Sequence, residues 1–303
     1  AASYWLGIHL SFAYCLVFGS LISPTDPIAV LGMLKKVRAP QSLSMRITGE
    51  SLYNDGVGIV LFITLLHIAK GNSIEHETIM WMVLREIIGG VGLGFLLGVV
   101  TNGFLRHVKE FHVSLLISLA SVMTGYALAI HWHASAPITL ATSGLVVGYK
   151  LKQGGLSLVT AKELQAFWEM IDEVLNAILF VVIGLVVLQL SVSQEALLLA
   201  GLAIPIVLFA RFASVSIPIS LFAHLYQYSP YVIRIMTWGG LRGGVSIALA
   251  LSLPAGTEKQ LILTVTYAVV LFSILIQGMT IQALIAKSIR KAALLNQRAL
   301  EDS

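Results

Sequence analysis

The stretch Ser23-Pro24-Thr25-Asp26-Pro27 interrupts a hydrophobic run that extends from about residue 4 to about residue 34. The run is longer than the ~20 residues that one helix needs to cross a bilayer. Pro24 and Pro27 lack a backbone donor, and a residue before proline avoids helical angles. We therefore expect the helix to unwind at Pro24–Asp26 and to restart with Asp26 as N-cap and Pro27 as its first residue.

Asp26 is a carboxylate at membrane depth, where a charged side chain costs about 2.5–3.5 kcal/mol on the insertion scale. Unwound backbone at that depth is stable only where protein or a water-filled cavity satisfies its polar groups. Secondary transporters use such broken helices to coordinate cations. The stretch therefore predicts an ion or proton pathway, and the alternative is a proline kink with a capped aspartate.

The composition extends this interpretation to the whole chain. Its 303 residues are 57% hydrophobic and 11% charged, with a mean hydropathy of +0.89, whereas a soluble domain carries about 25% charge. We therefore expect an all-α polytopic membrane protein. The net charge of +4 lies at segment ends, which indicates topology rather than nucleic-acid binding. Cys15 is the only cysteine, which excludes a disulfide framework and a cysteine-based metal site.

Hydropathy predicts nine membrane spans. We place them near 4–34, 44–68, 79–105, 111–131, 134–150, 165–190, 195–223, 232–253 and 259–287. Lys and Arg concentrate after every second span, beginning with the first, which predicts a cytoplasmic C-terminus. Gly90, Gly94 and Gly98, like Gly144 and Gly148, have the four-residue spacing that favours close helix packing.

A second polar stretch, Glu50-Ser51-Leu52-Tyr53-Asn54-Asp55, lies inside the second span. On a helix, Glu50 pairs with Asn54 and Ser51 pairs with Asp55, on two adjacent stripes. The hydroxyl and carboxylate oxygens of Ser51 and Asp55 suit a hard cation such as Na⁺, while the other pair supplies a structural network. The alternative for Glu50 is a position near the membrane surface beside Arg46.

Two arginines complete this set. Arg211 is the only charge within Ile204–Ile219 and requires a carboxylate partner, for which we choose Glu50, with Asn54 filling the remaining donors. Arg242 lies in Trp238-Gly239-Gly240-Leu241-Arg242-Gly243-Gly244, which interrupts the eighth span and predicts a second broken helix. The alternative for Arg242 is an arginine that snorkels at a helix end.

The charges of these residues do not cancel. The carboxylates of Asp26, Glu50 and Asp55 outnumber the guanidinium groups of Arg211 and Arg242 by one. One Na⁺ or one H⁺ neutralises the remainder when the two compete for the same oxygens. The count predicts exchange of one cation for one proton without net movement of charge.

These motifs closely resemble those of the electroneutral monovalent cation:proton antiporters, the bacterial NhaP-like and animal Na⁺/H⁺ exchanger group. The resemblance is carried by residues 23–27, 49–56 and 238–246 and extends over essentially the whole chain. It implies the NhaA-like inverted-repeat antiporter fold with two crossing discontinuous helices. It further implies a multi-pass protein of the bacterial inner membrane that forms a homodimer at full length. Such proteins have more spans, so the missing helices would precede residue 1.

The resemblance also implies which residues bind the ions. The backbone oxygen of Thr25 and the side chains of Asp26, Ser51 and Asp55 would bind the cation, with Na⁺ at Asp26, Ser51 and Asp55. Asp55 would alternately hold the cation and a proton. No cofactor is implied beyond the transported Na⁺ or Li⁺ and H⁺.

The resemblance assigns the remaining polar residues to the scaffold. Glu50, Asn54 and Arg211 would form the family's buried structural network, and Arg242 would belong to the second broken helix. Asn54 stands where electrogenic relatives carry a second aspartate, which agrees with the charge count. Four regions follow: 1–105 with the first broken helix, the acidic helix and a linker helix; 106–194 with gate or dimerisation helices and the start of the second repeat; 195–287 with Arg211 and the second broken helix; and a cytoplasmic tail at 288–303.

The leading functional prediction is a secondary-active Na⁺(Li⁺)/H⁺ antiporter with elevator-like alternating access. A K⁺/H⁺ antiporter of the same fold stays open, because ion selection depends on sub-ångström geometry. A cation channel is the alternative from another class, although buried acid–base pairs fit a transporter better. An enzyme is not expected, because neither His-Glu-x-x-His nor Gly-x-Gly-Asp occurs. The expected partners are the ions and the lipid bilayer, with no nucleic acid.

Overall fold

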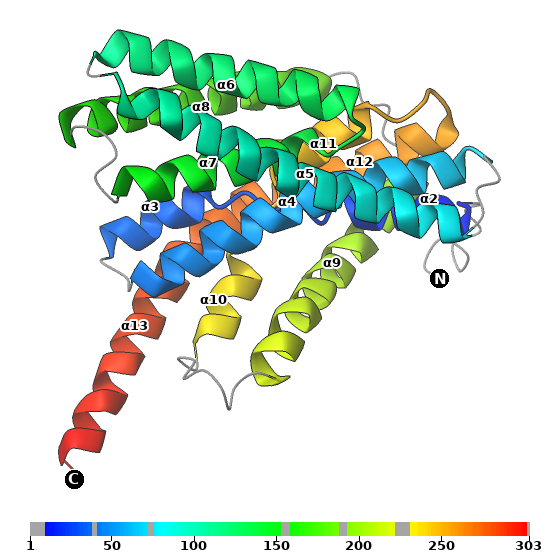
Figure 1. Cartoon of the computed structure of the whole chain (residues 1–303). Helices are drawn as coiled ribbons and strands as arrows, with labels where there is room; N and C mark the ends of the chain where they lie inside the picture. Colours follow the sequence, from blue (N-terminus) through cyan, green and yellow to red (C-terminus); the bar gives the residue numbers. More distant parts are fainter. Residues whose placement is uncertain are drawn as a thin grey trace. The chain divides into compact units, whose positions relative to one another are not determined.

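The computed structural model describes residues 10–37, 41–71, 76–108, 110–152, 158–187, 193–221 and 231–301. The regular elements in these ranges are helices (Figure 1). The chain forms two compact units, Ala1–Asn54 with Val186–Ser303 and Asp55–Leu185. One boundary falls inside the continuous helix α4, Gln41–Ala69, between Asn54 and Asp55, and the other falls between Leu185 and Val186, near the end of α8, Leu158–Val187.

In its described residues, the first unit contains two interrupted helices and three long ones. Its elements are α2 (Phe12–Leu21), α3 (Ile28–Lys36), the first part of α4, α9 (Gln194–Leu221), α10 (Val232–Trp238), α11 (Gly244–Leu251), α12 (Thr257–Phe272), a π-helical turn η1 (Ser273–Gln277) and α13 (Gly278–Glu301). The last three form one uninterrupted helical segment. The hydroxyl of Ser11 accepts a hydrogen bond from the Tyr14 N–H and so caps the start of α2.

Hydrophobic packing places α3, α10 and α13 side by side within this unit. Val30 and Leu34 on α3 share a buried cluster with Ile235 on α10 and with Ile281 and Ile285 on α13. Leu43 and Ile47 of α4 join the same cluster. In addition, α12 packs against α9 and α11. The cluster therefore anchors one half of each interrupted helix, α3 and α10, close to the polar residues that follow.

The second unit consists of the rest of α4 together with α5 (His76–Arg106), α6 (Phe111–His131), α7 (Ala136–Lys152) and α8 (Leu158–Val187). Gly90 and Gly98 allow α5 to approach α7 closely. A Cβ at Gly90 would lie 3.1 Å from the Ile138 side chain, and one at Gly98 would lie 2.7 Å from Cβ of Val146. The spacing of these α5 glycines therefore predicted a real helix contact.

The prediction for Gly144 and Gly148 is wrong within the part of the chain that the structure describes. A Cβ at either position would meet no atom within 4 Å. Both glycines instead line a cavity of about 690 Å³ together with Thr101, Ser121 and other residues of α5 to α8. The four-residue spacing shows only that small residues share one face of the helix. Close packing also requires a second helix against that face.

Five helices are long and apolar enough to cross a membrane, judged by length and composition within the described ranges. They are Gln41–Ala69, Trp81–Arg106, Phe111–His131, Gln194–Leu221 and Thr257–Ser288. The interrupted helices are too short in each half for that criterion, so the count of nine spans stays a prediction. Residues 4–9, 188–190 and 222–223 of the predicted spans lie outside the described residues.

Candidate functional site

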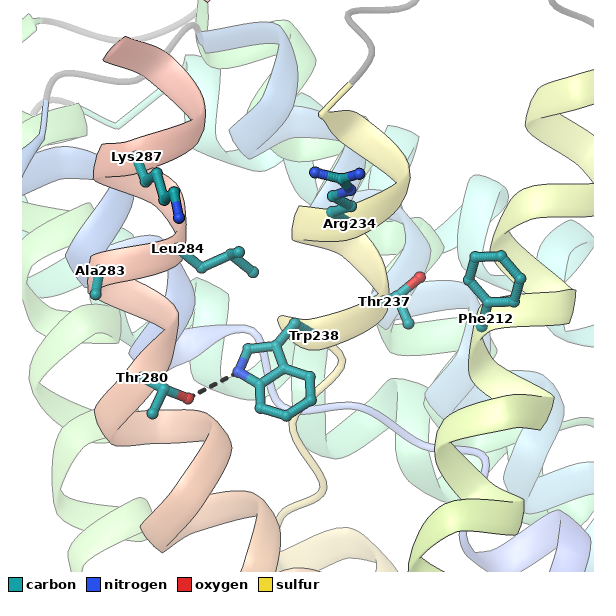
Figure 2. A pocket seen from close by; sticks show the side chains of 8 residues that line it. All are labelled: Phe212, Arg234, Thr237, Trp238, Thr280, Ala283, Leu284 and Lys287. Carbon is teal, nitrogen blue, oxygen red and sulfur yellow. Dashed lines mark hydrogen bonds between the residues drawn. The ribbon is translucent and has the colours of Figure 1, made fainter. Parts of the chain in front are cut away.

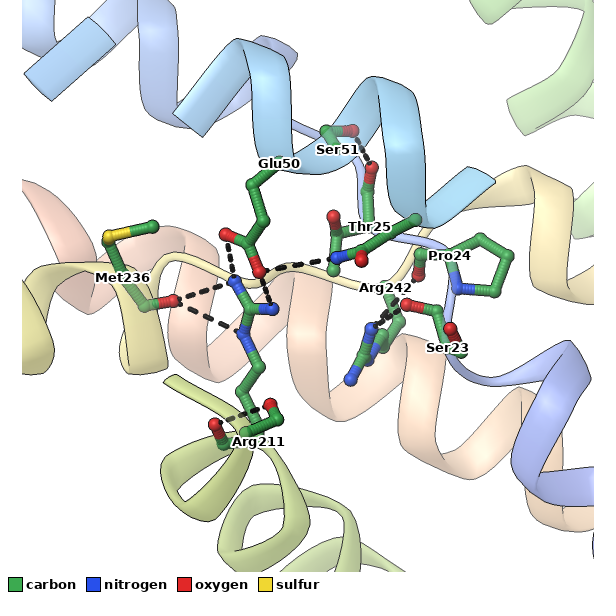
Figure 3. A network of polar contacts seen from close by, with 10 residues as sticks. Ser23, Pro24, Thr25, Glu50, Ser51, Arg211, Met236 and Arg242 are labelled. Atoms are coloured by element: carbon green, nitrogen blue, oxygen red, sulfur yellow. Dashed lines mark hydrogen bonds and ion pairs between the residues drawn. The ribbon is translucent and has the colours of Figure 1, made fainter. Parts of the chain in front are cut away.

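The first interruption separates α2, which ends at Leu21, from α3, which begins at Ile28 (Figure 3). The Pro27 carbonyl accepts the first helical hydrogen bond, from the Leu31 N–H at 2.8 Å. Pro27 therefore occupies the N-cap position, and the helix starts one residue later than predicted. The prediction of Asp26 as N-cap is wrong, because the first acceptor carbonyl of the helix belongs to Pro27.

The second interruption separates α10, which ends at Trp238, from α11, which begins at Gly244. Two of its glycines are required by close contacts. A Cβ at Gly243 would lie 2.8 Å from the Asp26 Cβ, and one at Gly240 would meet the Arg211 guanidinium. Any larger residue at Gly243 would push the two interrupted helices apart.

Hydrogen bonds join the two unwound segments directly. The Asp26 N–H donates to the Leu241 carbonyl at 2.8 Å. The Arg242 side chain, 7% exposed, donates from Nη1 to the carbonyls of Ser23 at 2.6 Å and Pro24 at 3.1 Å (Figure 3). The guanidinium thus satisfies carbonyl groups that the helix break deprives of partners. This position does not fit the alternative of an arginine snorkelling at a helix end.

Glu50 on α4 and Arg211 on α9 form a bidentate ion pair. Arg211 Nη1 donates to Glu50 Oε1, and Nη2 donates to Oε2 at 2.7 Å. Arg211 is 6% exposed, so that breaking this pair would leave a buried charge without compensation. The partner chosen from the sequence is therefore the partner in the structure, and Arg46 is not needed to explain Glu50.

The remaining donors of Arg211 bind the Met236 carbonyl, at 3.3 Å from Nε and 3.1 Å from Nη2. The prediction that Asn54 fills them is wrong, because Asn54 instead donates from Nδ2 to Glu50 Oε1 at 3.2 Å. Met236 lies in the last turn of α10, where backbone carbonyls have no partner within the helix. The sequence feature that points to the Met236 carbonyl is the glycine-rich interruption that follows this residue.

Ser51 connects α4 to the first interruption. Its hydroxyl donates to the Thr25 carbonyl, and both residues are buried. Asp26 follows Thr25 in the unwound segment and is partly buried. Asp55 lies one helical turn after Ser51 on α4 and is also partly buried. The structure thus brings Thr25 and Ser51 into contact and sets an aspartate beside each of them along the chain.

A buried pair that the sequence analysis missed holds the second unwound segment in place. Ser273 Oγ accepts from the Arg242 N–H and donates to Gln277 Oε1, each at 2.8 Å. Gln277 Nε2 donates to the Trp238 carbonyl at 3.0 Å. Both side chains are buried and belong to the π-helical turn η1, a feature frequent at functional sites. The sequence feature that points to this pair is the presence of two polar residues, four positions apart, in an apolar segment.

Comparisons with known proteins show which family this chain resembles. The family described as "Sodium/hydrogen exchanger, transmembrane" matches residues 1–287. The Na⁺/H⁺ antiporter NhaP of Pseudomonas aeruginosa is 43% identical over 286 residues, which are 93% of this chain and 68% of that protein. The Na⁺/H⁺ antiporter NhaH of Halobacillus aidingensis is 34% identical over 292 residues, covering 95% of this chain and 71% of that protein.

A solved structure shares the fold. The sodium proton antiporter MjNhaP1 from Methanocaldococcus jannaschii matches with a TM-score of 0.73 over 93% of this chain and 72% of that chain, at 18% sequence identity. The family consists of transporters rather than enzymes. A family match over nearly the whole chain, together with two interrupted helices joined beside a buried ion pair, identifies the chain as a member of the sodium/hydrogen exchanger family of membrane proteins.

Proposed function

We propose that this chain carries the ion site of a secondary-active antiporter that exchanges one Na⁺ or Li⁺ for one proton by alternating access. The observation that carries the proposal is the contact between the two unwound segments through Arg242. Freed backbone carbonyls and a neighbouring aspartate at membrane depth form the kind of site at which secondary transporters bind cations. The relatives named as Na⁺/H⁺ antiporters support exchange of Na⁺ for H⁺.

The proposed ligands are the Thr25 carbonyl and the side chains of Asp26, Ser51 and Asp55. All are hard oxygen donors, which suit Na⁺ and Li⁺. A carbonyl oxygen has two lone pairs, so the hydrogen bond from Ser51 to Thr25 does not prevent the same oxygen from binding a cation. Asp55 is proposed to hold the cation and the proton in turn.

The charges of the site favour electroneutral exchange. Arg211 neutralises Glu50 through the bidentate pair, and the charge count sets the one positive charge of Arg242 against the two negative charges of Asp26 and Asp55. One negative charge remains, and either one cation or one proton neutralises it. Asn54 contributes an amide to Glu50 and no charge.

The proposal includes the assembly in which the site works. We expect a homodimer in the plasma membrane, with the tail at 288–303 on the cytoplasmic side. The interrupted helices of 1–105 and 195–287 would move as a core against gate helices of 106–194.

Collapse of a pH gradient by added Na⁺, measured in everted membrane vesicles, tests the proposal. Asp55→Asn should abolish exchange, whereas Asp172→Asn, the same change on the exposed face of α8, should leave it intact. Parallel additions of Li⁺ and K⁺ determine the ion specificity. Sustained Na⁺/H⁺ exchange by the Asp55→Asn protein would contradict the site, and K⁺-driven exchange alone would favour the K⁺/H⁺ alternative.

A further inference from the structure

A groove of about 550 Å³ opens between α9, α10 and α13 in the first unit (Figure 2). It is lined by Phe212, Arg234, Thr237, Trp238, Thr280, Ala283, Leu284 and Lys287. The α13 residues recur every three or four positions, so that one face of this helix forms a wall. The groove is separate from the proposed ion ligands, and none of its lining residues takes part in the ion pair of Glu50.

The floor of the groove is apolar. The Trp238 indole donates from Nε1 to Thr280 Oγ1 at 2.8 Å, which fixes the ring between α10 and α13 (Figure 2). Leu284 and Ala283 continue the surface along α13, and the Phe212 side chain on α9 is 49% exposed. In a membrane protein, an apolar surface of this kind matches a hydrocarbon chain.

Two cations stand at one end of the same groove, Arg234 on α10 and Lys287 on α13 (Figure 2). Both are exposed, and neither forms an ion pair with any residue that the structure describes. Lys287 is next to the last residue of the apolar segment Thr257–Ser288. The end of such a segment is where we expect the hydrocarbon region to give way to the phosphate groups of the lipids, and Arg234 shares this end of the groove.

We propose that this groove binds an anionic phospholipid. The phosphate lies between Arg234 and Lys287, and an acyl chain covers Trp238, Leu284 and Phe212. Guanidinium groups bind phosphate oxygens with paired, charge-assisted hydrogen bonds, and ammonium groups bind them as point charges. Basic pockets between membrane helices select anionic headgroups for this reason. A choline headgroup would bring its own positive charge toward the two cations.

The bound lipid would act on the element that carries the second interruption. Arg234 and Trp238 belong to α10, whose last turn supplies the Met236 and Trp238 carbonyls to Arg211 and Gln277. A ligand that binds the folded state alone stabilises it by mass action. We therefore expect the lipid to raise the thermal stability of the protein whether or not the chain transports ions.

The experiment measures retention of phosphatidylglycerol and of phosphatidylcholine with identical acyl chains, by native mass spectrometry of the purified protein in detergent. The double variant Arg234→Gln/Lys287→Gln should bind phosphatidylglycerol roughly thirtyfold more weakly. The two cations contribute about equally to the affinity for an anionic headgroup, so that the loss of each one should weaken binding about five- to sixfold. The matched control Arg106→Gln/Lys150→Gln removes two cations from helix ends of the second unit and should bind as the wild type does.

A second variant tests the apolar floor while both charges stay in place. Ala283→Trp fills the groove and should reduce phosphatidylglycerol retention and the accompanying rise in the melting midpoint. Ala120→Trp makes the same change at an exposed position of α6 and should have no effect.

Three results would overturn the proposal. Equal retention of the two lipids by the wild type would remove the selectivity for anionic headgroups. Displacement of phosphatidylglycerol by millimolar inorganic phosphate would indicate a site for free anions. A change of oligomeric state in Ala283→Trp, with lipid retention unchanged, would mean that a second copy of the chain covers the groove.

Discussion

Glu50 and Arg211 show how a single buried charge determines the stability of the site. Replacing Glu50 by Gln keeps the shape of the side chain and removes the charge that compensates Arg211. Because removing one partner of a buried pair costs about 3–5 kcal/mol, and Glu50 is partly exposed, we expect a loss near the lower value. The measurement is the apparent melting midpoint of purified protein in detergent.

Glu163→Gln on the exposed side of α8 is the control for this substitution and should leave the midpoint unchanged. Equal midpoints for Glu50→Gln and the wild type would mean that the ion pair contributes little to the folded state. A midpoint lowered by Arg46→Gln instead would restore the alternative partner of Glu50.

Residue pairing was predictable where a buried charge requires a partner or where two polar residues lie one helical turn apart. A lone arginine in the apolar segment around Arg211 requires a carboxylate, and that requirement alone pointed to Glu50. The contact between Asn54 and Glu50 follows from their spacing of one helical turn. The contact between Arg211 and the Met236 carbonyl was not predictable, because the availability of that carbonyl depends on the residue at which α10 ends. The positions of Asp26 and Asp55 relative to a bound cation stay a prediction.

At the level of elements, the contact between the two unwound segments depends on a missing side chain at Gly243. Gly243→Ala would place a methyl group 2.8 Å from the Asp26 Cβ. We expect this change to separate the two segments and to reduce Na⁺/H⁺ exchange strongly in vesicles. Gly201→Ala on α9 is the control, because a Cβ there meets nothing within 4 Å and alanine favours a helix. Exchange at the wild-type rate by Gly243→Ala would show that transport does not depend on this close contact between the two segments.

A further prediction concerns the π-helical turn η1, whose side chains bind the backbone of the second interruption. Gln277→Leu keeps the approximate side-chain volume but removes the donor to the Trp238 carbonyl and the acceptor for Ser273. An unsatisfied buried polar group costs about 1–3 kcal/mol, so residues 238–244 should open more readily. Hydrogen exchange read by mass spectrometry should be faster there and unchanged in α6. Unchanged exchange in 238–244 would assign the support of this segment to other contacts.

The breaks themselves were predictable, and the turn that supports one of them was not. Prolines and glycines act locally, so Pro24, Pro27 and the glycines after Trp238 indicate interruptions from the sequence alone. A π-helical turn depends on one extra residue accommodated by tertiary packing and has no comparable local signal. The role of Ser273 and Gln277 was therefore recognised only from the structure, which shows their hydrogen bonds to Arg242 and Trp238 on the second interrupted helix.

At the level of the whole molecule, composition predicted the all-α membrane class because too few charged residues are present for a soluble surface. The division into two compact units was not predictable, since its two boundaries lie inside the helices α4 and α8, where the sequence carries no linker. Sequence patterns report local structure and hydropathy, whereas such a boundary depends on contacts between distant segments.

The last prediction concerns the charge moved by the whole transport cycle. With Glu50 paired to Arg211, the proposed site alternates between one bound cation and one bound proton and keeps the same net charge in both states. The rate of Na⁺/H⁺ exchange in proteoliposomes should therefore not change when a membrane potential is imposed in either direction. A potential-dependent rate, or a current on a supported membrane, would contradict the charge count. Asn54→Asp adds an ionisable group beside Glu50 and should be the variant in which a dependence on potential first emerges.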